Sequence, residues 1–493
     1  MKKSICFLVC MVIIFVITSC NSPIDAPAEI KETSDTAEDV SDIEETKEVS
    51  IFEILPDRDF GGIKFTIYVP PNPDSPVDKG TFVEDMTGES FNDVVFERNR
   101  NVEEQYNVKI AALYGNSWDT TYTDLKKNVL ANEMNADVYF THVMSGLGSM
   151  ITEGLLMEWT SVPHINFDNP WWNQSVNNNL SVANKLYYTS SSLSIDDPLV
   201  LLFNKEMAEA YSIENPYDLV KSGKWTIEKL RELSKAVSVD LNGDGEYKME
   251  DDQFGLEYGI QWQTPSLMYA CDEISMILDE NGYPELMLNT QKKITAYEKI
   301  FNLLYEGDQT YCYVGNTTET ANIPHIGIDS GRVLFCQWNL FSCEKLRDCE
   351  IDYGILPLPK YDEVQKDYMS NSWTGMYCLP IIISEETLDM VGILMESMSA
   401  LGKKDVIPVY YEVLLKEKIS RDEDSREMLD IILNGMVYDV GLNFSVGVDA
   451  PGMFIVPLIK SKNPNYVSEV EKRQEATVKA YDSFYETVNQ LEH

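Results

Sequence analysis

The sequence predicts an α/β protein in which one chain forms two folded bodies. A length of 493 residues is enough for two to three domains. Residues 63–140 alternate between strand-like and helix-like patterns, which is typical of a parallel sheet with helical crossovers. Further on, Asp196-Asp197-Pro198 precedes an unbroken apolar run at 199–203, which predicts a strand buried on both faces. A buried strand after a proline-marked joint indicates that a second body begins there.

The composition excludes some classes of partner. The chain has 81 Asp and Glu against 39 Lys and Arg, a formal net charge of −42. Binding to nucleic acid requires Lys and Arg to replace condensed counterions, and adhesion to anionic lipid requires the same positive charge. We therefore expect no nucleic-acid partner and a strongly hydrated surface.

The N-terminus has the pattern of a targeting segment. Lys2 and Lys3 precede an apolar stretch at 5–17, which is too short to prefer spanning a bilayer. The sequence Ile17-Thr18-Ser19-Cys20 resembles the lipobox of bacterial lipoproteins. Residues 1–20 are thus expected to be a lipoprotein signal peptide that ends at a lipidated Cys20, where two acyl chains such as palmitate give a stable anchor. A conventional signal peptide with an incidental cysteine is the alternative.

The segment that follows is predicted to be a tether. Residues 21–50 carry ten Asp and Glu and two Lys among Ser, Thr, Pro and Ala. Such a segment buries too little apolar surface to offset the entropy of ordering, so we expect a disordered, self-repelling linker. A lipid, a linker and a folded body together predict a protein anchored at the extracellular face of a bacterial cell membrane.

The first body is predicted to contain three strands in its N-terminal half. Strands are expected at 63–69, 108–113 and 137–140, with helices at 91–106 and 121–131 between them. In parallel sheets, ligands bind beyond the carboxyl ends of the strands. The loop after the third strand therefore supplies three candidate ligand-binding residues, Thr141, His142 and Ser145. A lone histidine in a loop is also commonly a simple hydrogen-bonding residue.

The rest of the chain shows further helical and strand patterns. The residues at 225–239 form a clear amphipathic helix with Thr226 as its N-cap. Further helices are expected at 292–305, 388–401, 406–415, 425–435 and 465–491, and short strands at 331–335, 352–358 and 381–383.

One loop has the spacing of a calcium site. Residues 240–251 place oxygen-bearing side chains at positions 1, 3 and 5, a glycine at position 6 and a carboxylate at position 12, as in EF-hand-type loops. The predicted metal-binding residues are Asp240, Asn242, Asp244, Glu246 and Asp251. Aspartate at position 12 and Lys248 at position 9 make the loop resemble the dockerin-type variant, and the ion is expected to be structural. An acidic turn that stays empty is the alternative.

Tryptophans near predicted loops suggest contact with sugar rings, because flat aromatic faces offer apolar contact to ring C–H groups. The candidates are Trp171, Trp172, Trp262, Trp338 and Trp373, together with Tyr377. The alternative is that they are core residues, which we favour for Trp171 and Trp172.

Signatures of enzymes are absent from the sequence. It contains no G-x-S-x-G, H-E-x-x-H, P-loop or G-x-G-x-x-G motif, and only four histidines. Asp196 and Asp197 could be read as a catalytic carboxylate pair, but neighbours in a strand face opposite ways. We keep Asp196 as a candidate ligand-binding residue. Six cysteines lie beyond Cys20, and disulfides or free thiols are both open for them.

Four segments together resemble the extracellular solute-binding proteins of ABC transporters, family 1, the maltose-binding-protein-like group. They are Asp137-Val-Tyr-Phe140 through Gly154-Leu-Leu-Met-Glu-Trp159, Pro198 to Lys205 ending in Leu-Leu-Phe-Asn-Lys, Ser330-Gly-Arg-Val-Leu-Phe335 to Trp338, and Asp352-Tyr-Gly-Ile-Leu-Pro-Leu-Pro359. Their order and spacing are jointly specific.

This resemblance implies a fold of two α/β lobes of the type II periplasmic-binding-protein kind. Each lobe is expected to hold a mainly parallel sheet flanked by helices, and three crossings are expected to join the lobes. Lobe 1 would hold 51–195 and 358–403, and lobe 2 would hold 196–357 and 404–493. By position, Trp338 corresponds to the family's sugar-stacking tryptophan, and 141–145 to its polar ligand loop.

The resemblance also implies the function. We expect a tethered, monomeric receptor that binds a carbohydrate between its lobes and delivers it to ABC permease subunits, with no organic cofactor and no catalysis. A receptor for another solute, such as a peptide or a polyol, is the first alternative. A lipid-anchored glycoside hydrolase that uses a carboxylate pair is the second.

Overall fold

The structure is a computed structural model and describes residues 49–71, 80–313, 327–341, 343, 346, 349–373, 375–414, 423–445 and 450–491. The predicted signal peptide, Cys20 and nearly all of the predicted tether lie outside these residues. The chain from Val49 onward forms a compact unit of its own.

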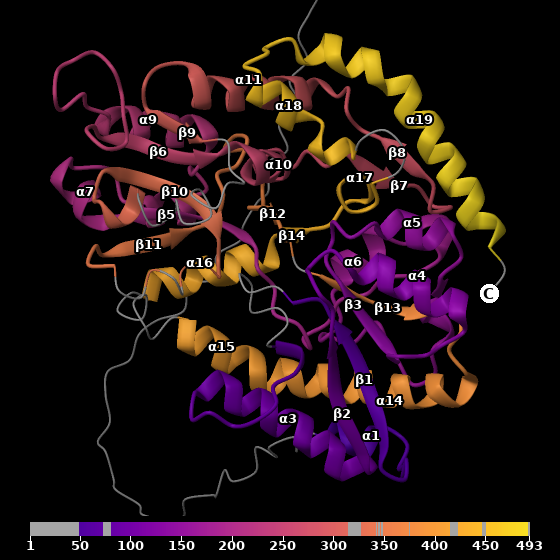
Figure 1. Ribbon diagram of the computed structural model, residues 1–493. Coiled ribbons are helices and arrows are strands. Elements are labelled where there is room, and N and C mark those ends of the chain that lie inside the picture. Colours follow the sequence, from indigo (N-terminus) through magenta and orange to yellow (C-terminus); the bar gives the residue numbers. More distant parts are fainter. Residues whose placement is uncertain are drawn as a thin grey trace, which may run out of the picture. The chain divides into compact units, whose positions relative to one another are not determined.

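The first sheet has five strands in the order β2-β1-β3-β13-β4 (Figure 1). The strands are β1 (Ile63–Val69), β2 (Val108–Tyr114), β3 (Val138–Thr141), β4 (Leu156–Met157) and β13 (Met376–Pro380). Strand β1 pairs in parallel with β2 and β3, whereas β13 pairs antiparallel with β3 and β4. The three predicted N-terminal strands are therefore confirmed, and a strand from much later in the chain joins them.

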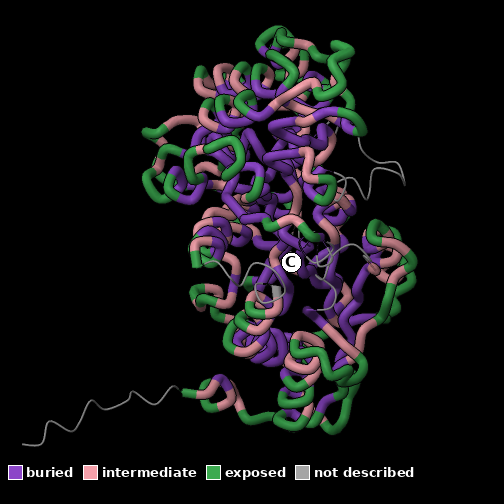
Figure 2. Tube along the Cα trace, turned by 90° about the vertical axis from the view of Figure 1, so that its left-hand side faces the viewer, coloured by how far each residue is buried: buried purple, intermediate pink, exposed green. Residues whose placement is uncertain are grey.

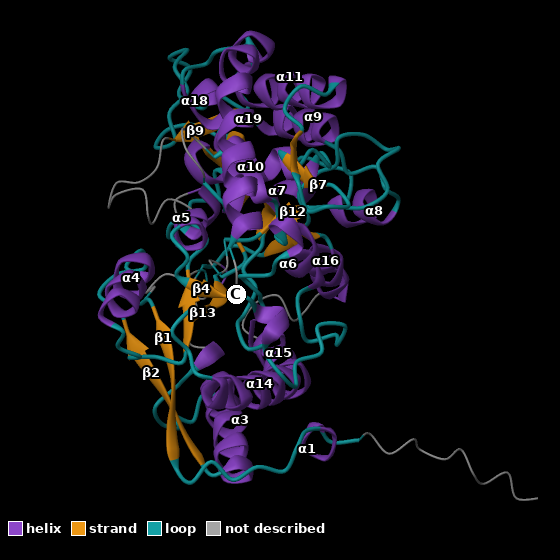
Figure 3. Cartoon of the chain, turned by 90° about the vertical axis from the view of Figure 1, so that its right-hand side faces the viewer, coloured by secondary structure: helices purple, strands orange, loops and turns teal. Residues whose placement is uncertain are grey.

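Alternating side chains of the first sheet enter two different cores. Phe65, Ile67 and Val69 of β1 pack with helices α3 (Ser90–Tyr106) and α14 (Glu385–Leu401) on one face. Tyr68 packs with α4 (Thr121–Ala131) on the other face. Figure 3 shows the strands between these helices. The alternation follows from the two-residue period of a strand, so both faces of this sheet are covered.

The second sheet also has five strands, in the order β11-β5-β10-β6-β9. They are β5 (Leu199–Asn204), β6 (Phe254–Gly259), β9 (Thr310–Tyr313), β10 (Val333–Asn339) and β11 (Tyr353–Leu356). Every residue of β5 is buried. Leu199, Leu201 and Phe203 enter one core, and Val200 and Leu202 enter another. The prediction of a strand buried on both faces is thus confirmed.

Helices cover the second sheet on both faces. The helices α9 (Ile227–Val237), α10 (Ile260–Ala270) and α11 (Gln291–Tyr305) pack in the larger core. The helices α15 (Ile407–Leu414) and α16 (Glu423–Asn434) contribute to the smaller one. Figure 2 shows buried, purple segments through the interior and exposed, green ones at the outer loops.

Two expectations about the strands need correction. Each sheet is mixed rather than mainly parallel, with two parallel and two antiparallel pairings. The antiparallel pairings involve strands that follow a passage from the other sheet, namely β5 and β13, so they need no parallel crossover. The strand expected at 381–383 is also misplaced. The strand ends at Pro380, and a turn follows it.

Three passages between the two sheets lie side by side in the described part of the chain. Pro198 forms a bridge with Ser372, and the Ser370 Oγ donates to the Leu199 carbonyl over 2.9 Å. The short strand β12 (Ser370–Asn371) pairs in parallel with β14 (Met436–Val437). The joint marked by Pro198 in the sequence is therefore where the three passages meet.

The C-terminal helix α19 (Tyr466–Gln490) connects both halves of this unit, as the yellow ribbon of Figure 1 shows. Its start packs in the larger core of the second sheet, and its end packs in a core of the first. Lys185 donates to the Val488 carbonyl over 3.0 Å. The strands β7 (Met276–Leu278) and β8 (Pro284–Leu286) form a hairpin that contacts the same region. The Ala183 N–H donates to the carbonyl of Gly282, in the turn of this hairpin, over 2.9 Å.

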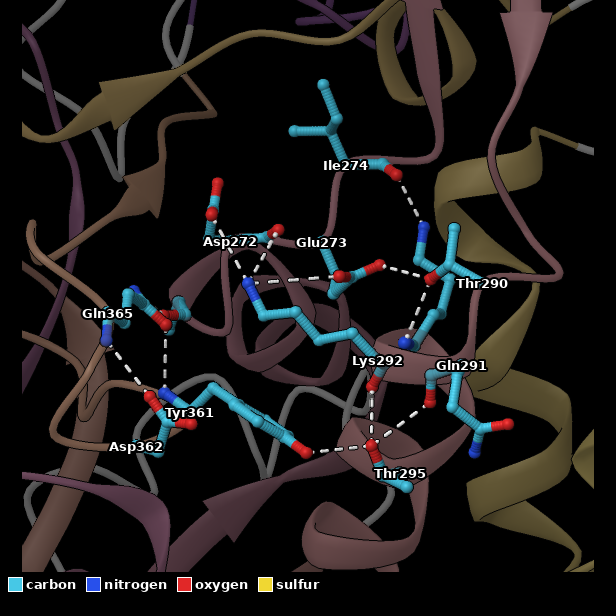
Figure 4. A network of polar contacts seen from close by, with 12 residues as sticks. Asp272, Glu273, Ile274, Thr290, Gln291, Lys292, Thr295, Tyr361, Asp362 and Gln365 are labelled. Atoms are coloured by element: carbon cyan, nitrogen blue, oxygen red, sulfur yellow. Dashed lines mark hydrogen bonds and ion pairs between the residues drawn. The ribbon is translucent and has the colours of Figure 1, made fainter. Parts of the chain in front are cut away.

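A polar network joins the start of α11 to the ends of its neighbours (Figure 4). The Thr290 Oγ1, which also caps the helix, donates to Glu273 over 2.9 Å. Lys292 lies 3.2 Å from Asp272. The Thr295 hydroxyl is 2.8 Å from that of Tyr361, so the segment that follows β11 is held against this helix.

The remaining elements are short. They are α1 (Ile51–Ile54), α5 (Leu147–Thr152), η1 (Trp159–Ser161), α6 (Gln174–Asn179), η2 (Val182–Asn184), α7 (Lys205–Ala210), α8 (Pro216–Lys221), η3 (Gly402–Val406), α17 (Val440–Asn443), η5 (Pro451–Met453) and α18 (Ile455–Lys460). Within the described ranges, none of the helices combines the length and the apolar character that a membrane span requires. The six cysteines after Cys20 carry free thiols.

Candidate functional site

The carboxyl edge of the first sheet carries residues from two distant segments. Strand β3 ends at Thr141, and β13 begins opposite it, because Met376 pairs with Thr141 in antiparallel register. Trp373, which precedes β13, therefore lies at the same edge as the loop after Thr141. Gly375 confirms this closeness, since a Cβ placed on it would lie 2.5 Å from the Thr141 carbonyl oxygen.

The carboxyl edge of the second sheet gathers three aromatic residues. Strands β6, β9 and β10 run parallel, and Gly259 at the end of β6 pairs with Tyr313 at the end of β9. Trp338 is close to the end of β10, and Trp262 lies in the first turn of α10, directly after β6. The rings of Tyr313 and Trp338 are 6.5 Å apart at 34°.

A tryptophan pair connects the two edges. The rings of Trp262 and Trp373 lie 5.5 Å apart, at 78°. Trp373 is half-buried and packs against a core of each sheet. Next to this pair, the side-chain amides of Gln263 and Gln337 each donate to the other residue's backbone carbonyl over 3.4 Å. The structure thus brings together Trp262 and Trp373 and places Trp338 beside them on the second sheet.

The predicted polar loop of the first sheet lies against Trp118. The His142 and Trp118 rings are 4.9 Å apart, and the Ser145 hydroxyl donates to the Trp118 carbonyl over 3.2 Å. The Met144 N–H donates to His142 Nδ1 over 3.2 Å, so the neutral ring carries its proton on Nε2. Burial lowers the pKa of His142 to about 4, which keeps the imidazole neutral at pH 7. Thr141 is fully buried.

Asp196 and its neighbour take different places at the joint. Asp196 accepts a hydrogen bond from the Tyr438 hydroxyl over 3.4 Å, and burial raises the pKa of its carboxyl to about 6. Asp197 accepts hydrogen bonds from the Asn339 amide and from the Phe341 N–H, the latter over 2.8 Å. The two carboxylates therefore serve different structural partners.

Two predicted tryptophans lie elsewhere. Trp172 is 2% exposed, packs in the core beside α14, and donates its Nε1–H to Glu396 over 2.8 Å. Trp172 therefore packs as a core residue of the first sheet. Trp171 is half-buried and packs against the same core.

The predicted calcium loop forms a turn held by its own side chains. Asp240 accepts hydrogen bonds from the Gly243 and Gly245 N–H groups over 2.6 and 2.9 Å. Asp251 is exposed, whereas Asp252 is buried and accepts the Leu241 and Lys248 N–H groups. The oxygen donors suit calcium, but no group of three or more His, Cys, Asp or Glu is placed to hold a metal within the described residues. Calcium binding stays a prediction.

Sequence reasoning missed several residues at these edges, namely Trp118, Tyr313, Gln263 and Gln337. Trp118 follows the strand at 108–113, so the rule that ligands bind beyond strand ends could have found it. Tyr313 and Gln263 depend on β6 and β9, which the sequence patterns did not predict: β6 is short and buried on both faces, and β9 has only four residues, so neither shows a clear alternation.

Comparisons with known proteins found no matching family model and no matching curated protein. Solved structures do match. An ABC substrate-binding protein of Listeria monocytogenes in complex with cycloalternan gives a TM-score of 0.50 at 12% identity, over 87% of this chain and 98% of the other. A cyclo/maltodextrin-binding protein with maltotetraose gives 0.52 at 15% identity, over 87% and 98%. UspC of M. tuberculosis gives 0.51 at 12% identity, over 85% and 100%.

Likeness at such low identity establishes the fold. The chain has the two-lobed α/β fold of ABC-transporter solute-binding proteins, as the four sequence segments implied.

Proposed function

We propose that this protein is the solute receptor of an ABC importer and binds a carbohydrate where the carboxyl edges of its two sheets meet. The contact between Trp262 and Trp373 carries this proposal, because it joins the ligand-binding edge of one sheet to that of the other. The proposed lobes are 51–195 with 358–403, and 196–357 with 404–493.

The chemistry of these edges favours a sugar. Aromatic rings from both sheets offer flat apolar faces, and the Gln263 and Gln337 amides lie next to them. Stacking faces beside neutral hydrogen-bonding groups suit a ring that carries C–H groups on its faces and hydroxyls on its rim. Two structural neighbours were solved with oligosaccharides, cycloalternan and maltotetraose, which supports the same class of ligand.

Binding without catalysis fits the residues at the joint. A glycoside hydrolase needs two carboxyl groups on opposite sides of a glycosidic bond, whereas Asp196 and Asp197 have separate structural partners. We infer that solute binding favours a closed arrangement of the lobes, because only that arrangement brings both edges to the solute. The closed receptor then delivers its solute to permease subunits at the membrane, where lipid on Cys20 tethers it as a monomer.

Calorimetry tests the proposal. The full chain is titrated with a panel of maltotetraose, cellotetraose, xylotetraose, a mixed tetrapeptide and sorbitol. We expect saturable binding of at least one oligosaccharide. Replacing Trp262 or Trp373 by Ala should raise its Kd by about 5- to 150-fold, which corresponds to about 1–3 kcal/mol of stacking. The control is Tyr211→Ala at the exposed end of α7, which should leave the Kd unchanged.

Two outcomes would count against this function. Binding of the peptide or of sorbitol alone would favour a receptor for another solute. Release of product from a chromogenic glycoside, lost on replacing Asp196 by Asn, would instead indicate a hydrolase.

A further inference from the structure

Asn371 has a side-chain amide that is buried and unused. It lies on β12, between the passages that join the two sheets, and is 1% exposed. Among the described residues, neither its Oδ1 nor its Nδ2 has a hydrogen-bond partner. An asparagine amide offers two donors and an acceptor with two lone pairs, and burying all of them without partners is unfavourable. The backbone beside it is well paired, since the Ser370 N–H donates to the Gly435 carbonyl over 3.0 Å and Ser372 bridges to Pro198.

Two further buried polar atoms without partners lie close by. Within the part of the chain that the structure describes, the Trp373 indole Nε1–H has no acceptor and the Ser266 hydroxyl has no partner. Residues two apart in an extended segment point to the same side, so Asn371 and Trp373 share one side of β12 and its continuation. Ser266 lies one helical turn after Trp262, on the same face of α10. That helix packs against β12, and Trp262 contacts Trp373.

These three side chains, Asn371, Trp373 and Ser266, define what we name the orphan polar site. All of its groups are neutral at pH 7: an amide, an indole N–H and a hydroxyl. It sits directly beside the aromatic pair that the proposed function assigns to sugar stacking. Neutral donors and acceptors of this kind complement hydroxyl groups, because each hydroxyl can donate and accept at once. They give no counter-charge to a carboxylate or an ammonium group.

We propose that the orphan polar site selects a neutral sugar ring, with the Asn371 amide bonding to ring hydroxyls while the ring contacts Trp262 or Trp373. This rests on the proposed function and adds to it a ligand class, uncharged sugars rather than uronic acids or amino sugars, and a residue that sets specificity. Because α10 packs against β12 and Asn371 is 1% exposed, the sugar reaches the amide only if α10 and β12 separate and then close over the ring.

The alternative occupant of the orphan polar site is ordered water, which would make Asn371 a structural residue. The variant Asn371→Leu separates the two roles, because it keeps the size of the side chain and removes every hydrogen-bonding atom. If water bonds to the amide, this variant loses those bonds and its Tm without sugar falls. If the amide is unused until sugar arrives, the Tm without sugar is unchanged or higher, and only sugar binding suffers.

The experiment titrates the full chain and its variants with the three neutral tetrasaccharides of the panel and with tetragalacturonate, and records the Tm of each variant without sugar. We expect Asn371→Leu to raise the Kd of the neutral sugar at least 30-fold with no loss in Tm. Ser266→Ala, a milder change, should raise the Kd about 3- to 10-fold, and it remains informative if Asn371→Leu does not fold.

The matched control is Asn177→Leu, another buried amide, whose oxygen already accepts the Thr189 hydroxyl over 2.8 Å. It should lower the Tm and leave the Kd unchanged.

The outcomes distinguish the two proposals. If the unmodified chain binds no oligosaccharide, the proposed function fails, and this inference falls with it. If it binds a neutral sugar but Asn371→Leu and Ser266→Ala bind equally well, only the inference is overturned. Tighter binding of tetragalacturonate than of any neutral sugar, or a lower Tm for Asn371→Leu with an unchanged Kd, also overturns it.

Discussion

Asp439 supplies a demanding test of how α10, β7 and α17 pack together. Its side chain is 1% exposed and accepts hydrogen bonds from five donors in three segments. The Tyr269 hydroxyl donates over 2.8 Å and the Ser275 N–H over 2.6 Å, and the Ser275 hydroxyl donates as well. The Met276 and Gly441 N–H groups donate over 3.1 and 2.7 Å. One carboxylate therefore joins α10, β7 and the start of α17.

Replacing Asp439 by Ala leaves these donors buried without an acceptor. Each hydrogen bond to a charged group contributes about 1.5–3 kcal/mol, but the five share one carboxylate, so their contributions do not add. Breaking a buried charged network by removing one member costs about 3–5 kcal/mol. We expect a loss of that size in the free energy of unfolding, which is a large part of the about 5–15 kcal/mol typical of proteins.

Urea denaturation followed by tryptophan fluorescence measures this loss from the shift in midpoint at constant m-value. The control is Asp362→Ala, which removes a carboxylate that accepts only the Val364 and Gln365 N–H groups in a partly exposed turn. This variant should lose less than about 1 kcal/mol. A loss below about 1 kcal/mol for Asp439→Ala as well would refute the reasoning, since it would mean that the five donors find other partners.

Three further predictions concern other parts of the chain. Gly282→Ala should lower the free energy of unfolding by about 2–4 kcal/mol, because Gly282 has φ +71° and a Cβ there would lie 2.5 Å from the Asn184 N. The control Gly243→Ala, where φ is +75° and the space is open, should lower it by only about 1–2 kcal/mol. Equal losses in urea denaturation would contradict a steric clash at Gly282. Burial raises the pKa of the Glu257 carboxyl to about 8, so the folded protein keeps this group protonated at pH values where the unfolded chain, with the ordinary pKa of 4.5, ionises it. The protonated carboxyl therefore contributes fully to stability below pH 4.5, and this contribution is lost as the pH rises to about 8. The Tm of Glu257→Gln should gain on that of the unmodified protein between pH 5 and pH 8, and a parallel pH dependence of the two Tm values would speak against this assignment. If the loop at 240–251 binds calcium, EDTA should lower the Tm of the full chain and Asp244→Ala should abolish that difference, whereas an unchanged Tm with EDTA would leave no support for the ion.

Hydrophobic periodicity determined much of the local structure. The unbroken apolar run at 199–203 predicted a strand buried on both faces, and β5 is buried along its whole length. The helix predicted at 121–131 has those bounds in the structure. These patterns are readable because a strand or helix that lies between two layers has to repeat its apolar residues with the period of its own backbone.

The candidate site was predictable only in parts. Trp338 and Trp373 were suggested by their places beside predicted strand ends, and Trp262 by its aromatic ring alone, but no local pattern shows that Trp262 and Trp373 meet. Sequence patterns also gave no sign of Asn371, because a buried amide without partners looks like any other asparagine in a polar segment.

What the sequence determined by itself was the alternation of elements and the joint at Pro198, both of which depend on residues close together in the chain. Only the tertiary structure decided which edges face each other, which carboxylate receives five donors and which amide is left without partners. Those properties depend on contacts between residues far apart in the sequence, which the order of the strands in each sheet sets and which no short segment encodes.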